Sequence, residues 1–280
     1  MDMDKTKALR LLAVKIRKYV LESVQAANSG HIGGSFSMAE ILSVLYFDRL
    51  RIDPKNPQKP DRDRFVLSKG HCAPAAYAAL ALRGFFPVED LKGFRSIDSY
   101  LSGHIEMKHI PGVDMSAGSL GQGFSVSVGM ALAGKTDNLD YKVYTVTGDG
   151  EIQEGQIWEA AMAAGHFKLD NLRLFIDNNG LQLDGAIADI MSVYPIEDKF
   201  RAFGWHTITV NGNDVAELSA ALDEADTVKG KPTVIVAKTV KGKGVSIFEN
   251  KIQFHGGRPT AEQYVIAYKE LDAQIKELEV

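Results

Sequence analysis

Short apolar runs alternate with longer helical patterns along this sequence. Five runs rich in β-branched or aromatic residues are expected to form strands: 64–67, 142–146, 172–176, 206–210 and 233–237. Apolar positions recur near helical spacing in five other segments: 6–27, 121–133, 156–167, 214–228 and 261–279. Strands that alternate with helices are typical of βαβ units. The pattern therefore predicts an α/β fold, in which a mostly parallel sheet has helices on both faces.

One further helix and one loop-rich segment complete the expected layout. Glu40 follows Ser37 at the spacing of a capping box, so a helix is expected to begin at Ser37. Residues 83–119 are expected to be rich in loops. No internal repeat and no Pro/Ser-rich linker divides the chain, so we expect one domain over residues 1–280.

Composition narrows the classes of protein that fit. The 32 Lys and Arg residues against 36 Asp and Glu residues give a net charge of −4, which does not support a basic nucleic-acid-binding face. The longest uncharged apolar run, 72–82, is too short to span a bilayer. The first ten residues are charged and lack the apolar core of a signal peptide. One cysteine, Cys72, excludes an intramolecular disulfide. We expect a cytoplasmic protein that binds neither nucleic acid nor membrane.

The strongest motif follows the second predicted strand. That strand leads directly into Thr147-Gly148-Asp149-Gly150, and a predicted helix comes soon afterwards. Glycines in such a turn let backbone N–H groups approach a phosphate, and the helix N-terminus favours negative charge. A carboxylate in the same turn opposes a phosphate unless a cation lies between them. Asp149 is therefore a candidate ligand for Mg²⁺ or Ca²⁺ that bridges the protein to a diphosphate.

A second set of polar residues follows the next predicted strand, which ends in Ile176-Asp177-Asn178-Asn179-Gly180-Leu181. Adjacent parallel strands place their carboxyl ends at one edge of the sheet, where ligands bind in open α/β folds. The amide oxygen of Asn179 and a carbonyl of the following turn can then complete an oxygen-rich site. If Asp149 were only a turn residue and the Asn pair only a hairpin or C-cap signal, their place after consecutive buried strands would have no explanation.

These two motifs together resemble the thiamine diphosphate motif. Gly148-Asp149-Gly150 is separated by 27 residues from Asn178-Asn179. The resemblance implies that Asp149, Asn179 and the backbone of Leu181 bind the metal ion, Mg²⁺ or Ca²⁺.

Four further motifs make the resemblance more specific. They are Ser29-Gly30-His31-Ile32-Gly33-Gly34-Ser35, Ser68-Lys69-Gly70-His71, Gly103-His104-Ile105-Glu106 and Gly118-Ser119-Leu120-Gly121-Gln122-Gly123. With the Gly-Asp-Gly motif, their order and spacing resemble the amino-terminal, thiamine diphosphate-binding domain of transketolase from about Leu11 to His255. Ile32, Ile105, Ser119 and Asn178 depart from residues that are frequent in the family, but no proposed ligand is lost.

The resemblance implies roles for each group of residues. The implied catalytic residues, which line the substrate channel and the diphosphate end, are His31, His71, His104 and His255. The implied cofactor-binding residues are His71, Gly118, Ser119, Leu120, Gly148, Asp149, Gly150, Glu154, Asn179 and His255. Imidazole suits this chemistry because sugar hydroxyls must lose and regain protons near neutral pH. Lys241 and Lys243, in a glycine-rich loop, are expected to be mainly solvated, with contact to a phosphate as the alternative.

The implied activity is the transfer of a two-carbon ketol unit from a ketose phosphate to an aldose, dependent on thiamine diphosphate and a metal ion. In the family, a second, pyrimidine-binding domain supplies the carboxylic acid and the aromatic floor for the pyrimidine ring. The chain is therefore expected to be the amino-terminal subunit of a split transketolase. It is expected to pair with a carboxy-terminal subunit, in two copies of each chain. A truncated form of a longer polypeptide is the alternative to a natural subunit.

Three other functions remain as alternatives. The α subunit of a 2-oxo acid dehydrogenase shares the Gly-Asp-Gly and Asn-Asn motif, but the histidine motifs favour transketolase. A nicotinamide-binding Rossmann enzyme needs a glycine fingerprint after the first strand, and the sequence has none. A regulator with a degenerate site conflicts with the intact Asp149, Asn179 and histidines.

Overall fold

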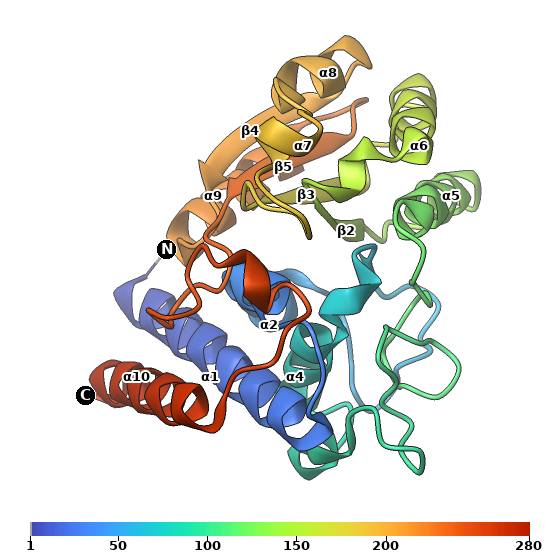
Figure 1. The fold of residues 1–280 in the computed structure, drawn as a ribbon. Coiled ribbons are helices and arrows are strands. Elements are labelled where there is room, and N and C mark those ends of the chain that lie inside the picture. The colour runs from blue at the N-terminus through green and yellow to red at the C-terminus, as the bar shows by residue number, and fades with distance from the viewer. Residues whose placement is uncertain (1) are drawn as a thin grey trace.

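The centre of the fold is a five-stranded parallel sheet. The structure is a computed structural model that describes residues 2–280. Its strands are β1 (Arg64–Leu67), β2 (Val143–Gly148), β3 (Leu172–Asn178), β4 (His206–Asn211) and β5 (Thr233–Lys238). They pair in the order β1-β2-β3-β5-β4, and every pair is parallel (Figure 1). Each run predicted as a strand overlaps one of them, which confirms the predicted sheet.

Helices cover both faces of this sheet, as predicted. They are α1 (Met3–Ala27), α2 (Ile32–Ser37), α3 (Ala39–Val44), α4 (Ala73–Arg83), α5 (Gln122–Thr136), α6 (Gly155–His166), α7 (Ile187–Ile190), α8 (Ile196–Ala202), α9 (Val215–Thr227) and α10 (Ala261–Glu279). Buried side chains of α1, α3, α4 and α9 form one core with the sheet, and those of α5, α6 and α8 form another.

The alternation of side chains along β3 shows why two cores form. Phe175 joins the core under α1 and α4, whereas Leu174 and Ile176 join the core under α5 and α6. Successive residues of a strand point to opposite faces, so a strand buried on both sides needs apolar residues at every position. This is why β3 reads as a continuous apolar run.

Segments from the two ends of the chain lie side by side. Helices α1 and α10 run next to each other in Figure 1, and Lys18 of α1 donates to the Asp272 carboxylate of α10 at 2.7 Å. Between α4 and α5, a 3₁₀ helix at Val88–Gly93 interrupts a long stretch of turns and loops. Among residues 2–280, no helix has both the length and the apolar character needed to cross a membrane.

The predicted capping box at Ser37 is wrong. Ser37 is the last residue of the buried helix α2, and α3 begins at Ala39 after a break at Met38. The Ser37 hydroxyl donates to Asp177 at 2.5 Å, and Glu40 instead accepts a hydrogen bond from the Arg17 guanidinium at 2.6 Å. Both polar side chains are buried, and each has a tertiary partner, although the Ser37 hydroxyl also lies 3.0 Å from the backbone oxygen of Gly34.

Two helical glycines should respond in opposite ways to substitution by alanine. A Cβ atom at Gly165 in α6 would lie 1.9 Å from the backbone oxygen of Phe203, whereas a Cβ atom at Gly129 in α5 would meet nothing within 4 Å. Alanine is favoured over glycine inside a helix by about 1 kcal/mol. We expect Gly129→Ala to raise the free energy of unfolding by up to about 1 kcal/mol and Gly165→Ala to lower it. Urea denaturation monitored by circular dichroism measures both changes. A stabilised Gly165→Ala would contradict the close packing of α6 against the segment after α8.

Candidate active site

A cavity of about 350 Å³ opens at the carboxyl ends of β2 and β3. Most of the residues proposed from the sequence line it: His31, His71, Gly118, Leu120, Gly148, Asp149, Gly150, Glu154, Asn179, Leu181 and His255. His104 and Ser119 are exposed and do not line this cavity, although each lies beside lining residues. The structure thus gathers residues that are more than 200 positions apart in the sequence.

Four imidazole rings form one group at this cavity. The ring centroid of His31 lies 5.1 Å from that of His71, 5.7 Å from that of His255 and 6.1 Å from that of His104. The rings of His71 and His255 stack, with their centroids 5.3 Å apart. His104 therefore belongs to the same group and occupies its solvent-exposed side.

Burial and neighbouring basic side chains keep these imidazoles neutral. Burial and the neighbouring His71 lower the pKa of His31 to about 4. Burial and the charge of Lys69 lower the pKa of His71 to about 4, and burial with the charge of Lys241 lowers the pKa of His255 to about 3. The pKa of His104 is also lowered, by burial and by His71. Neutral rings at pH 7 can accept protons or hydrogen bonds from hydroxyl groups.

The Gly-Asp-Gly turn and the Asn pair meet because their strands are neighbours. Gly148 of β2 stands opposite Asp177 of β3, so Asp149 lies beside the turn that follows β3. The Asp149 carboxylate accepts hydrogen bonds from the backbone N–H groups of Gly150 at 2.9 Å and Gly180 at 2.6 Å. The side-chain oxygen of Asn179 accepts from the N–H of Leu181 at 3.1 Å. The predicted juxtaposition of Asp149 and Asn179 is therefore present.

The donor set at this turn fits a hard divalent cation. Asp149 is only 2% exposed, and burial together with the charge of Asp177 raises its pKa to about 7. A cation beside this carboxylate would favour its charged form. No cluster of three or more His, Cys, Asp or Glu side chains suited to a metal ion occurs within residues 2–280. One carboxylate, one amide oxygen and one carbonyl are ligands that Mg²⁺ and Ca²⁺ accept when phosphate and water complete the shell.

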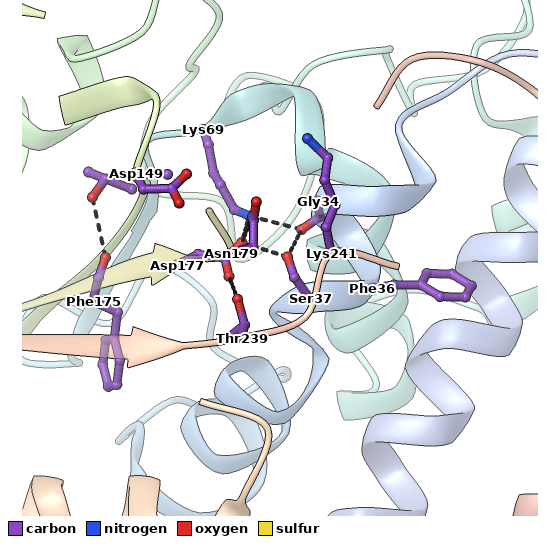
Figure 2. Close-up of polar contacts among 12 residues, drawn as sticks. Gly34, Phe36, Ser37, Lys69, Asp149, Phe175, Asp177, Asn179, Thr239 and Lys241 are labelled. Atoms are coloured by element: carbon purple, nitrogen blue, oxygen red, sulfur yellow. Dashed lines mark hydrogen bonds and ion pairs between the residues drawn. The ribbon is translucent and has the colours of Figure 1, made fainter. Parts of the chain in front are cut away.

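A buried ion pair lies beneath the site, and the sequence reasoning missed it. Lys69 and Asp177 are 2% and 0% exposed, and the Lys69 ammonium donates to the Asp177 carboxylate (Figure 2). Burial by itself would lower the pKa of Lys69, but the charge of Asp177 raises it above its ordinary value. Lys69 stands in the Ser-Lys-Gly-His motif, and Asp177 begins the Asp-Asn-Asn run. A charged residue in each of these two segments was the only sign in the sequence that they could form an ion pair.

Lys241 is buried, which corrects its interpretation as a solvated residue. Its side chain is 1% exposed. The ammonium group donates to the carbonyl oxygen of Leu181 at 3.1 Å and lies 2.9 Å from Nδ1 of His255. Burial and the charge of Lys69 lower the pKa of Lys241 to about 8. The loop after β5 therefore places a cationic side chain inside the cavity.

Glu151 joins three loops that line the cavity, and it too was missed. One oxygen of its carboxylate accepts from the Ser68 hydroxyl and from the N–H of Gly121, the latter at 2.9 Å. The other oxygen accepts from the N–H of Gly148 at 3.0 Å. These contacts hold the Ser-Lys-Gly-His loop, the start of α5 and the Gly-Asp-Gly turn together.

Comparisons with known proteins all match the chain to one family. Residues 8–273 match the family described as transketolase, thiamine diphosphate binding domain. The chain is 48% identical over 259 residues to the 6-deoxy-6-sulfo-D-fructose transketolase subunit of a Clostridium species, covering 92% of this chain and 94% of that protein. It is 44% identical over 271 residues to an apulose-4-phosphate transketolase subunit of Phocaeicola vulgatus, covering 97% of this chain and 96% of that one.

Solved structures show the same likeness. The transketolase of Campylobacter jejuni superimposes with a TM-score of 0.90 at 34% identity, covering 99% of this chain and 46% of that one. The transketolase of Leishmania mexicana gives a TM-score of 0.85 at 31% identity, covering 97% and 45%. The chain therefore spans about half the length of the solved transketolases that it matches.

The neutral state of His71 should appear in the pH dependence of stability. Because burial lowers the pKa of His71 from 6.5 to about 4, the unfolded chain binds a proton in this window that the folded chain does not. Stability is therefore lost as pH falls from about 6.5 towards 4. We expect wild type to lose about 1–2 kcal/mol more than His71→Asn between pH 7 and pH 5. Urea denaturation at both pH values measures the difference, and parallel losses in the two proteins would show that His71 titrates normally.

Proposed function

The chain belongs to the transketolase family, as its thiamine diphosphate-binding domain, and we propose that it is the amino-terminal subunit of a two-chain transketolase. Its reaction would transfer a two-carbon ketol unit from a ketose phosphate to an aldose. One observation carries this proposal above the others. The imidazole group formed by His31, His71, His104 and His255 meets the oxygen ligands of the Gly-Asp-Gly turn at a single cavity.

The cavity has groups for the diphosphate end of the cofactor and for one side of its pyrimidine ring. Asp149, Asn179 and the Leu181 carbonyl would hold Mg²⁺ or Ca²⁺ against the diphosphate. The backbone of Gly148 and Gly150 would approach the phosphates, with His71, His255 and Glu154 nearby, and Gly118–Leu120 would lie beside the pyrimidine ring. Thiamine diphosphate would supply the nucleophilic carbon and the electron sink for carbon–carbon bond cleavage.

The histidines of this chain would position the sugar and move its protons. His104, on the open side of the group, is suited to bind the C1 hydroxyl of the donor. His31, His71 and His255 lie deeper and are neutral at pH 7, so they can accept a proton or a hydrogen bond from sugar hydroxyls. A neutral ring close to several others returns a proton readily, because the charged form is disfavoured there.

A partner chain would complete the site. The residues that line the cavity, within the described part of the chain, include no Phe, Tyr or Trp to form an aromatic floor. Leu120 and Leu183 line the cavity but are 36% and 59% exposed, and Met191 nearby in the chain is 63% exposed. A pyrimidine-binding subunit that covers these side chains would supply the missing floor and the carboxylic acid for the pyrimidine ring. Relatives that carry subunit names support this arrangement, and we propose two copies of each chain.

The relatives also narrow the substrate class. Two of them are named for a sulfonated and a phosphorylated ketose. Both sugars carry an anionic group, which supports an anionic ketose as the donor.

Oxidative decarboxylation, as the α subunit of a 2-oxo acid dehydrogenase, remains the alternative activity, although the family match favours transketolase. An assay that compares pyruvate with a ketose phosphate as substrate separates the two activities, because a 2-oxo acid dehydrogenase would use pyruvate and a transketolase would use the ketose phosphate. The single cysteine supports a cytoplasmic location, which we propose for the chain.

Removal of the Asp149 carboxylate should weaken cation-dependent cofactor binding. In Asp149→Ala, the diphosphate would face the Gly-Asp-Gly turn without a bridging cation. We expect the affinity of the assembled complex for thiamine diphosphate in the presence of Mg²⁺ to fall by at least about 10-fold, the lower end for a damaged metal site. Isothermal titration calorimetry measures this affinity. Unchanged cofactor affinity would contradict the assignment of Asp149 as a cation ligand.

Substitution of His104 should impair turnover but not folding. The side chain is exposed, so His104→Ala should change the free energy of unfolding by less than about 1 kcal/mol. Loss of one proton-transfer or transition-state contact should lower kcat/KM for a ketose phosphate by roughly 10²-fold. Steady-state kinetics and thermal denaturation test both parts, with exposed His109→Ala as the matched control. Full activity in His104→Ala would contradict its role.

The purified chain should be catalytically silent without its partner. We expect no ketol transfer when this chain alone is incubated with thiamine diphosphate, Mg²⁺ and a ketose–aldose pair, and turnover when a pyrimidine-binding transketolase subunit is added. A coupled assay of the aldose product measures both. Robust turnover by the single chain would show that the two-chain arrangement is wrong.

A further inference from the structure

The Asp177 carboxylate is fully buried and is the centre of a cluster of polar side chains (Figure 2). It stands near the carboxyl end of β3 and receives hydrogen bonds from four side chains. The donors are the Lys69 ammonium, the Ser37 hydroxyl at 2.5 Å, the Thr239 hydroxyl and the Asn179 amide nitrogen at 3.3 Å. These donors come from α2, the loop after β1, the turn after β3 and the segment after β5. The cluster therefore joins four segments directly beneath the proposed cation site.

The chemistry of a carboxylate decides how the neighbouring amide is turned. Asp177 is paired with Lys69, and an ionised carboxylate can only accept hydrogen bonds. The NH₂ group of Asn179 must therefore point towards Asp177, because an oxygen there would face an oxygen. The amide oxygen of Asn179 is left on the opposite side, where it accepts from the N–H of Leu181 at 3.1 Å. Its other lone pair remains free to bind a cation.

We propose that Asp177 is a positioning residue, which holds the Asn179 amide with its oxygen towards the cation. This inference rests on the proposed function only in assuming that Asp149, Asn179 and Leu181 bind a divalent cation. Asp177 itself would not touch the cation, the cofactor or the sugar. Partners of metal ligands that act in this way commonly change metal affinity by 10–100-fold when they are lost.

Lys69 makes this arrangement possible by compensating the charge of Asp177. The ammonium group also donates to the carbonyl oxygen of Gly34 at 2.9 Å, so it is held between α2 and β3. A buried carboxylate is costly unless an opposite charge and hydrogen bonds accompany it. The pair thus keeps the Asp177 oxygens in place beside Asn179 while it adds no net charge under the cation site.

The experiment separates the acceptor from the ion pair. Lys69→Met combined with Asp177→Asn removes both charges but keeps a side-chain oxygen that can accept from Asn179. Lys69→Met combined with Asp177→Leu removes both charges and the acceptor at similar volume. Each double variant is prepared with thiamine diphosphate and the pyrimidine-binding subunit. Mn²⁺ is the probe, and its dissociation constant is measured from the free-ion signal in electron paramagnetic resonance. Thermal denaturation of each complex is measured in parallel.

The two double variants should differ in cation affinity. We expect the Asn-containing variant to bind Mn²⁺ within about 3-fold of wild type and the Leu-containing variant to bind about 10–100-fold more weakly. If the Leu variant does not fold, Val at position 177 replaces it. Equal affinities in the two variants, whether both high or both low, would overturn the positioning role and leave the cluster as a structural contact.

A third variant distinguishes failure of this inference from failure of the proposed function. Asp149→Ala in the same assay removes a proposed cation ligand. If it binds Mn²⁺ as wild type does, the cation site itself is misplaced, and the role of Asp177 falls with it. If Asp149→Ala loses Mn²⁺ while the two double variants behave alike, the cation site stands and only the positioning role is wrong.

Discussion

The parallel pairing of β2 with β3 is the constraint on which the rest of the site depends. Its register sets Gly148 opposite Asp177, so the turns that follow both strands meet at one edge of the sheet. A slip of one residue would carry Asp177 to the other face of the sheet, away from Lys69 and α2. Asp149 would then lose Gly180 as a hydrogen-bond donor, and Asn179 would lose its acceptor.

Some of the buried charged side chains in this site are paired with an opposite charge, and others are not. Lys69 and Asp177 neutralise each other, which limits the cost of burying two ions. Asp149 and Lys241 are also buried, yet the pKa of Asp149 is raised to about 7 and that of Lys241 is lowered to about 8. Burial without sufficient opposite charge thus shifts the protonation equilibrium of both groups towards the neutral form. A divalent cation and a diphosphate together would bring charges that complement both. The electrostatics of the chain by itself therefore favours a ligand that carries charges of both signs.

The sequence predicted the elements with periodic patterns and the site residues with local motifs. All five strands were found because each is a short apolar run, and Asp149 and Asn179 were placed together because parallel strands share an edge. The errors concern contacts between distant residues. Ser37 was assigned to a helix cap, although its partner Asp177 lies 140 residues away. Lys241 was assigned to solvent, because a lysine in a glycine-rich loop does not reveal that it folds back onto Leu181. Burial of single polar residues depends on tertiary packing, which no local pattern records.

Backbone contacts explain how loops far apart in sequence present their functional residues to one cavity. The N–H of Ile105 donates to the Gly70 carbonyl at 3.2 Å, and the N–H of Ala117 donates to the Ile105 carbonyl at 3.1 Å. His71, His104 and Gly118 are the immediate neighbours of these three residues, so two hydrogen bonds place all of them. A Cβ atom at Gly70 would lie 1.9 Å from the backbone oxygen of Ala117, so only glycine allows this approach. Gly70, the glycine beside His71, therefore has a structural reason. It lets neighbouring loops touch through their backbones, and the imidazoles of His71 and His104 converge because the backbones do.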